Sequence, residues 1–121
     1  NAYTQADLDW RNRDSRSSVE MHDEGARPEL AGNPLDAGRY DVVFLGYPIW
    51  WDLCPRAVNT FLEQYDFSGK TVIPFATSGG STITNSARQL RILYPKISWR
   101  EGQLLNGGAG QAGKWARQAI E

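Results

Sequence analysis

The chain has 121 residues, of which 40% are hydrophobic and 22% are charged, as in globular domains and unlike disordered segments. Its formal net charge of −1 argues against nucleic acid as the main partner, because phosphate binding needs a basic excess. Cys54 is the single cysteine, which excludes an intrachain disulfide, and no apolar run approaches the ~20 residues that cross a bilayer. We therefore expect one cytoplasmic domain over residues 1–121 without a membrane span. Because the chain begins at Asn1, we expect a processed, trimmed or incomplete product.

Residues 1–39 are polar and rich in turn-forming residues. Residues 17–20, SSVE, have the Ser-x-x-Glu spacing of a capping box, in which side chains satisfy free backbone amides at a helix start. This predicts a short helix, because Gly25 and Pro28 follow. Residues 29–40 predict a loop.

The next segment predicts a strand followed by a helix. Residues 40–47, YDVVFLGY, form a continuous apolar run that is typical of a parallel strand buried on both faces. Pro55 suits the first turn of the helix that follows, where no amide partner is needed. The apolar face of that helix repeats at i, i+3, i+4 and i+7, at Val58, Phe61, Leu62 and Tyr65.

The C-terminal half repeats the alternation. Residues 71–77, TVIPFAT, predict a second strand, although Pro74 is unusual in a central strand. A Gly-rich turn then leads into a helix that Pro95 ends, with one face formed by Ile83, Ala87, Leu90 and Tyr94. Residues 96–106 predict a third strand and residues 107–113, GGAGQAG, a loop. A last helix contains residues 114–121 and residues before them.

The order of alternating strands and helices predicts an α/β fold with a parallel sheet and right-handed crossovers. In such folds, ligands bind beyond the carboxyl ends of the strands. Two loops leave those ends here, GYPIWWDLCP (residues 46–55) and TSGGST (residues 77–82). The sequence therefore predicts a site between these loops.

The first loop carries Trp50 and Trp51, for which two interpretations stay open. They either cap the core or an interface, or they form a flat aromatic wall for a planar ligand, which Pro48 would stiffen. In the second loop, Gly79 and Gly80 can adopt a positive φ and let the backbone approach a ligand closely. The alternative is a flexible turn with a Ser or Thr helix cap.

Other chemistry is weakly supported by the sequence. His22 is the single histidine and lies in the polar segment, and nothing places Ser78 or Ser81 beside it as a nucleophile. One Cys and one His are too few ligands for a tetrahedral metal site. Cys54 stands at a predicted helix N-terminus, where the dipole could lower its pKa, but a small packed side chain is the simpler interpretation.

Residues 40–91 resemble the flavodoxins, in particular short bacterial flavodoxin-like proteins. The shared pattern is GYPIWW, P, FLE, DFSGK and PF-x-TSGGS in the same order, and the likeness extends over about residues 1–106. This resemblance implies a flavodoxin-like three-layer sandwich that binds FMN without a covalent bond. It also implies a redox function with an unknown redox partner, as an electron carrier or a quinone-reductase-like, FMN-dependent oxidoreductase.

The resemblance also implies roles for particular residues. The first loop would contact the flavin ring through Pro48, Ile49, Trp50 and Trp51, with Trp50 as the stacking residue. The second loop would supply hydrogen bonds to the ring edge from Thr77, Ser78, Gly79 and Gly80. Stacking in a low-dielectric pocket would disfavour the reduced, negatively charged flavin and lower its reduction potential.

One departure from the family pattern is large. Flavodoxins begin with a strand, a phosphate-binding loop, a first helix and a second strand, and we find none of these. We therefore expect an N-terminally truncated sheet of family strands 3-4-5 in place of 2-1-3-4-5, with impaired FMN affinity. The strand in residues 40–47 would become an edge, which predicts a homodimer formed by edge pairing or exchanged elements. The alternative function is a cofactor-free remnant that self-associates.

Overall fold

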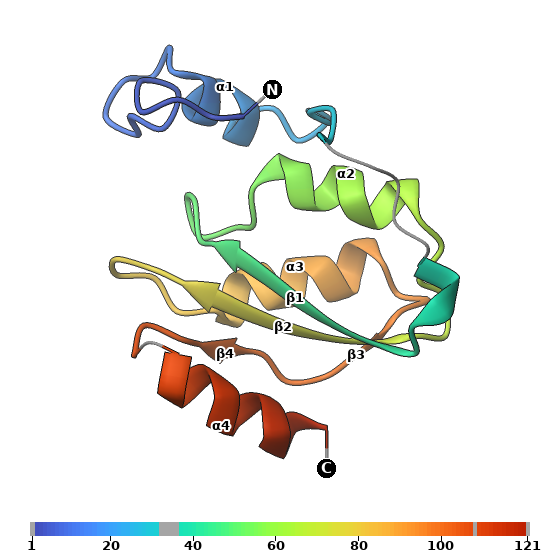
Figure 1. The fold of residues 1–121 in the computed structure, drawn as a ribbon. Coiled ribbons are helices and arrows are strands. Elements are labelled where there is room, and N and C mark those ends of the chain that lie inside the picture. The colour runs from blue at the N-terminus through green and yellow to red at the C-terminus, as the bar shows by residue number, and fades with distance from the viewer. Residues whose placement is uncertain (1, 32–36, 108, 121) are drawn as a thin grey trace.

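The computed structural model describes residues 2–31, 37–107 and 109–120. Strands and helices alternate along most of the chain, and the strands form one layer with helices on both faces (Figure 1). The strands are β1 (Val42–Pro48), β2 (Thr71–Thr77), β3 (Ser98–Trp99) and β4 (Gln103–Leu104). The helices are α1 (Arg16–Met21), the 3₁₀ turn η1 (Ala37–Arg39), α2 (Arg56–Gln64), α3 (Thr84–Leu93) and α4 (Ala109–Ala119).

The sheet is parallel throughout, as the sequence predicts. β1 pairs with β2 over seven rungs, from Val42 with Thr71 to Pro48 with Thr77. β3 and β4 both pair with the other side of β2, so together they occupy the place of the predicted third strand. Among the described residues, β1 pairs on one side only and is an edge strand.

Pro74 explains why that third strand is broken into two. Trp99 pairs with Val72 and Gln103 pairs with Phe75, so β2 advances three residues while its partner advances four. The extra residue lies opposite Pro74, which has no N–H to donate toward that side of the sheet. Gly102 sits at this bulge, where a Cβ would lie 2.9 Å from the Pro74 ring and 3.0 Å from its carbonyl oxygen.

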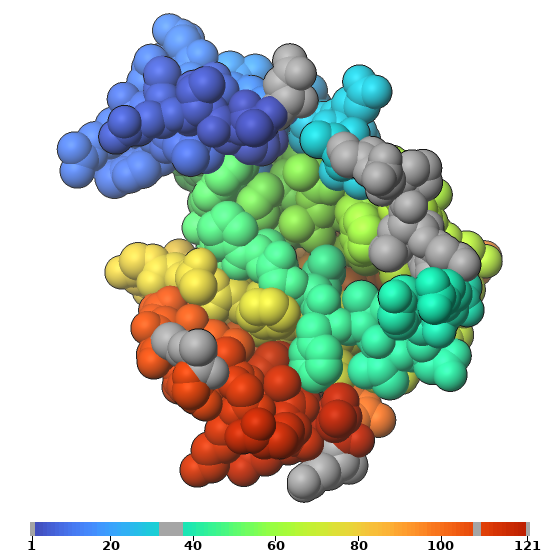
Figure 2. All heavy atoms as spheres, in the orientation of Figure 1, coloured from blue at the N-terminus to red at the C-terminus, as the bar shows by residue number. Residues whose placement is uncertain are grey.

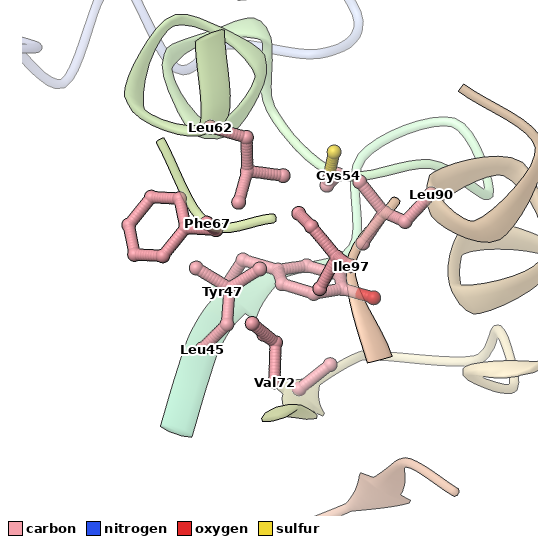
Figure 3. Packing of buried hydrophobic residues seen from close by; sticks show 9 residues of the cluster. Leu45, Tyr47, Cys54, Leu62, Phe67, Val72, Leu90 and Ile97 are labelled. Atoms are coloured by element: carbon pink, nitrogen blue, oxygen red, sulfur yellow. The ribbon is translucent and has the colours of Figure 1, made fainter. Parts of the chain in front are cut away.

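The main core lies between the sheet and the helices α2 and α3. Leu45 and Tyr47 of β1 and Val72 of β2 face Leu62 and Leu90 of these helices (Figure 3). Side chains two residues apart on a strand point to the same face of the sheet, as Leu45 and Tyr47 do here. The apolar faces that the sequence predicts for α2 and α3 therefore pack against this face of the sheet.

The opposite face of β1 corrects the prediction of a strand buried on both sides. Side chains on β1 alternate, and Val42 and Phe44 remain 42% and 37% exposed. α4 covers this face only in part, with Trp115 packed edge-on against Phe44 at 5.6 Å between ring centroids. Gly46 leaves room on the same face for the Phe75 ring, which a Cβ would meet at 2.3 Å. The apolar run thus reflects an edge strand under one partial helix.

Two local boundaries also differ from the prediction. Helix α1 begins at Arg16, with Ser15 as its N-cap accepting a bond from the Ser18 N–H, so the capping residue is Ser15 and not Ser17. Helix α4 begins at Ala109, inside the segment predicted as a loop. Tertiary packing of Trp115 on the sheet offsets the low helix propensity of the glycines there. No helix in the described ranges is long and apolar enough to cross a membrane.

The N-terminal segment, residues 2–31, is held on the rest of the fold by Arg56. This buried side chain donates from Nε to the Glu20 carbonyl at 3.3 Å and from Nη2 to the Met21 carbonyl at 2.9 Å. Both carbonyls belong to the end of α1, where the helix provides few backbone donors, and the Glu20 carbonyl also accepts from the Asp23 N–H at 3.2 Å. Arg56 lies in the first turn of α2, so it joins segments that are 35 or more residues apart.

A second contact fixes the other end of this segment to α2. The Arg27 Nε atom donates to both carboxylate oxygens of Glu63, at 3.0 and 2.9 Å, and Tyr94 donates to the same carboxylate at 2.5 Å. The Arg27 guanidinium lowers the pKa of Glu63. Burial, followed by this bond to Glu63, raises the pKa of Tyr94 to about 12, so Tyr94 remains a donor at neutral pH. The ion pair is largely exposed and contributes less than the buried Arg56.

We predict that Arg56→Met lowers the free energy of unfolding by about 1.5–3 kcal/mol, because the carbonyls of Glu20 and Met21 lose a charged donor while the apolar stem is kept. Urea denaturation measures this change. Limited trypsin digestion should then cleave after Arg11 and Arg13 faster than in the wild type. Arg91→Met, at an exposed arginine of α3, is the matched control. Equal stability and cleavage in the two variants would contradict the role of Arg56.

Candidate functional site

The two loops predicted to face a ligand leave the sheet side by side. Pro48 and Thr77 form the last rung between β1 and β2. One residue further, the Ile49 N–H still donates to the Thr77 carbonyl at 3.0 Å. Both loops and the N-terminal segment lie at this same end of the strands (Figures 1 and 2). The sheet register alone therefore brings these segments together.

A groove of about 670 Å³ opens at this end of the sheet, within the range of roughly 300–1,000 Å³ that small-molecule sites occupy. The N-terminal segment, the loop after β1 and the loop after β2 each supply part of its wall. Its lining residues are Leu8, Trp10, Ser17, Ile49, Trp50, Trp51, Ser78, Gly79, Gly80 and Ser81. None of them carries a charge, so the described wall is neutral.

Most of the residues that the sequence singles out are brought together in this groove. Ile49, both tryptophans, Ser78 and the two glycines line it, whereas Pro48 and Thr77 close the β1–β2 ladder beneath it. Their direct contact with a ligand stays a prediction.

Sequence reasoning missed the wall formed by the N-terminal segment. Leu8, Trp10 and Ser17 come from a stretch predicted as polar and turn-rich with one short helix, and none of them was expected to contact a ligand. Trp10 is the signal that could have revealed it, because a tryptophan in a polar segment is unusual and this one is 66% exposed. The placement of the wall depends on Arg56, which local pattern cannot foresee.

Residues 50–53 form a tight turn with a strained tryptophan. Trp50 and Leu53 exchange two backbone hydrogen bonds of 2.9 Å, and the intervening Trp51 and Asp52 have φ values of 47° and 64°. Two consecutive positive φ values are typical of a type I′ turn, which favours Asn-Gly. Asp tolerates this region but a bulky side chain does not, at a cost of order 1–3 kcal/mol. Asn85 stabilises the turn by donating to the Asp52 carbonyl at 3.1 Å.

The two tryptophans have different surroundings. Trp50 is half-buried and meets the Tyr3 ring edge-on at 5.4 Å between centroids. Trp51 is 39% exposed and meets the His22 ring edge-on at 5.5 Å. Tyr3 also donates to the Glu20 carboxylate, and burial, followed by this bond, raises the pKa of Tyr3 to about 12. Tyr3, which packs against Trp50, therefore remains uncharged at neutral pH.

The Gly-rich loop is ordered by hydrogen bonds and not by unusual glycine conformations. The Ser78 Oγ accepts from the Gly80 and Ser81 N–H groups at 3.1 and 2.7 Å. Asn106 brackets Ser78, accepting from its N–H at 3.2 Å and donating to its carbonyl at 2.9 Å. Gly79 and Gly80 do not use the positive φ that glycine allows, and Gly69 is the glycine with that conformation in the described chain. A Cβ at Gly79 or Gly80 would meet open space, so their absent side chains leave the backbone accessible from the groove.

Cys54 lies behind the aromatic turn as a packed core residue. It is buried, and burial raises the pKa of its thiol to about 11. Desolvation outweighs the favourable charge of Arg56, which favours the packed side chain over a thiolate activated by a helix dipole.

Other catalytic or metal chemistry finds no support in the described residues. The His22 Nδ1 atom bonds the Ser18 carbonyl at 2.7 Å, and no serine hydroxyl among the described residues bonds this ring. No group of three or more His, Cys, Asp or Glu side chains there could hold a metal ion.

Comparison with known families identifies the fold. Residues 1–118 match the family described as Flavodoxin. The chain belongs to the flavodoxin family. The parallel sheet with helices on both faces is the flavodoxin-like α/β fold predicted from the sequence.

Solved structures agree with this assignment. A protein of Bacteroides eggerthii DSM 20697 described as a proposed flavoprotein is 53% identical, with a TM-score of 0.90 over 100% of this chain and 77% of its own. A similarly described protein of Bacteroides uniformis ATCC 8492 is 50% identical, with a TM-score of 0.91 over 97% and 76%. A Lactobacillus acidophilus NCFM flavoprotein in complex with FMN is 18% identical, with a TM-score of 0.63 over 83% and 65%, which shows the fold alone. A search of curated proteins finds no significant match.

We predict that Cys54 does not react with a disulfide reagent such as Ellman's reagent at pH 8 in the native flavodoxin. The thiol is both buried and held neutral, and only the thiolate attacks. Reaction should become fast in concentrated guanidinium chloride. Ser68→Cys with Cys54→Ala, which moves the thiol to an exposed loop position, should react at once in the native state. Rapid native labelling of the wild type would disprove the packed assignment.

Proposed function

We propose that this flavodoxin binds FMN in the groove and works as a redox flavoprotein. The observation that carries the proposal is the pairing of Trp50 and Trp51 with the open Gly79–Gly80 backbone, at the carboxyl ends of two adjacent parallel strands. This is the position where ligands of open α/β sheets bind.

The lining suits the flat ring system of a flavin. Indole rings on one wall offer stacking partners, and stacked aromatic pairs contribute about 0.5–1.5 kcal/mol beyond their area burial. On the other wall, no described residue accepts a bond from the Gly79 N–H, which leaves it available to a carbonyl at the ring edge. The neutral wall imposes no charge penalty on an uncharged ring.

Family membership and the FMN complex of the Lactobacillus relative support the choice of cofactor. When bound, FMN supplies one- and two-electron transfer. The residues of this chain hold the ring, exclude water from its faces and surround it with few charges. A neutral, low-dielectric groove disfavours the negatively charged reduced flavin and lowers its reduction potential below that of free FMN.

The affinity for FMN is proposed to come from the ring and not from the phosphate. The described lining contains no cation. FMN and riboflavin should therefore bind this chain with affinities within about threefold of each other, since a phosphate contact of 1.4 kcal/mol would give tenfold. The impaired FMN affinity expected from the sequence would thus be seen as a missing contribution of the phosphate to binding.

We predict that titration with FMN quenches flavin fluorescence and that Trp50→Ala and Trp51→Asn each weaken binding by about tenfold or more, through lost stacking and burial. Asn tolerates the conformation of Trp51, so Trp51→Asn keeps the turn and removes only the ring. Thermal unfolding confirms that each variant is folded.

Trp115→Phe is the matched control, because this ring packs on the sheet outside the groove. It should leave the affinity for FMN unchanged. If the wild type shows no quenching at high micromolar FMN, or if Trp115→Phe weakens binding as much as the groove variants, the proposed site is wrong.

A second proposal is self-association through the edge of β1. The Thr71 N–H donates to the Asp41 carbonyl and the Ile49 N–H to the Thr77 carbonyl, so alternate residues of β1 use their backbone groups toward β2. Val42, Phe44 and Gly46 then direct theirs away from β2, and Pro48 at the next such position has no N–H. An apolar hollow of about 350 Å³ lies along this strand and includes Phe44, Val58 and Phe61. A second copy would pair its own β1 here across a two-fold axis.

We predict that light scattering finds a dimer of the 13.5 kDa chain whose population grows with protein concentration. Val42→Lys should shift the population to monomer, because an exposed lysine on an edge strand opposes pairing. Ile92→Lys places the same charge on the exposed face of α3 and should leave the dimer intact. A wild type that stays monomeric at all concentrations would end this proposal without affecting FMN binding.

A further inference from the structure

A second hollow lies next to the groove and shares Trp10 and Trp51 with it. It measures about 620 Å³, and we call it the basic hollow. Besides the two tryptophans, its lining contains Arg11, Arg13 and His22, with Ser18 and Val19 from α1. Every charged or titratable side chain in this lining is basic, although the whole chain has a net charge of −1. The local charge therefore does not follow from the overall composition.

The two arginines of the basic hollow are not neutralised by neighbouring carboxylates. The ion pairs within the described ranges join Arg16 to Glu20 and Arg27 to Glu63. The guanidinium of Arg11 instead lies over the Trp10 ring, at 5.2 Å from its centroid. The carboxylate of Asp9 accepts the backbone N–H of Arg11 and is not part of the lining. Both guanidinium groups are thus available to an anion from outside.

His22 adds a third nitrogen donor or acceptor to this hollow. Its Nδ1 must donate to the Ser18 carbonyl at 2.7 Å, because a carbonyl oxygen can only accept. The Nε2 atom has no bond to any described residue, so it can accept from or, when protonated, donate to a ligand. The ring also stands edge-on to Trp51 at 73°. The strained turn at Trp51 therefore presents one indole to both hollows.

We propose that the basic hollow binds a small planar organic acid, with its ring against Trp10 or Trp51 and its carboxylate or phosphate between Arg11 and Arg13. A guanidinium presents a planar fork of donors that matches an oxyanion, and stacking of Arg11 on Trp10 orients that fork beforehand. The two indoles supply the apolar, aromatic surface that favours a flat ligand over an inorganic anion. Binding of such an acid does not require flavin.

The role of this acid rests on the proposed function. Trp51 lines both hollows, so a ligand held there would be separated from a groove-bound flavin by a single side chain. The basic hollow then defines the chemical class of the small molecule that meets the flavin as a planar, anionic compound.

The test uses the flavin-free protein and NMR titration of the indole N–H signals with benzoate and with phenyl phosphate. Both acids should saturate one site. Benzamide, which lacks the charge, and inorganic phosphate, which lacks the ring, should bind at least about tenfold more weakly, as expected for loss of about 1.4 kcal/mol. Arg11→Gln and Arg13→Gln should each weaken benzoate binding by about tenfold, whereas Arg91→Gln on α3 should not change it. The same titrations decide whether the site prefers the carboxylate or the phosphate.

The outcomes separate this inference from FMN binding. Arg11→Gln and Arg13→Gln should leave the affinities for FMN and riboflavin unchanged. If either variant weakens FMN but not riboflavin, the hollow holds the flavin phosphate and our assignment is overturned. Absence of saturable benzoate or phenyl phosphate binding, or equal weakening by Arg91→Gln, would also overturn it, whether or not FMN binds.

Discussion

The candidate site depends on one buried side chain, Arg56. Its guanidinium satisfies the last carbonyls of α1 and so fixes the N-terminal segment on α2. The two loops after β1 and β2 build the floor of the groove, whereas the wall that contains Leu8 and Trp10 belongs to the segment that Arg56 holds. The site thus combines a rigid part that follows from the sheet register with a docked part that follows from long-range contacts, among which the buried Arg56 is central.

The sheet and the rigid part of the site could be predicted because their signals are local. The apolar runs of β1 and β2 and the helical spacing of residues such as Leu62 and Leu90 each fall within a few residues. Once two strands are known to be parallel neighbours, their carboxyl ends must meet, and the loops containing Trp50 and Gly79 must lie side by side. No knowledge of the detailed packing is needed for that step.

The remainder could not be predicted because it depends on contacts between distant residues. Pro74 indicates from the sequence that the pairing of β2 is interrupted. The position of the bulge and the close approach of Gly102 become evident only when the partner strand is placed. The extent of α4 depends on where Trp115 meets the sheet. The hydrogen bonds of Ser78 and Asn106 that hold the loop of Gly79 and Gly80 likewise join residues that the local pattern does not connect.

The conformation of Trp51 bears on both interpretations of the paired tryptophans. A tryptophan that only caps a core would gain most from complete burial and would need no unusual backbone. Trp51 instead accepts a positive φ, remains 39% exposed and lines two hollows of different character, one neutral and one basic. Strain in a bulky residue persists only where the surroundings impose it, here through the paired bonds of the turn and the support of Asn85. In our proposal, that arrangement places the Trp51 indole between the flavin and the planar acid, which accounts for its exposure and its positive φ together.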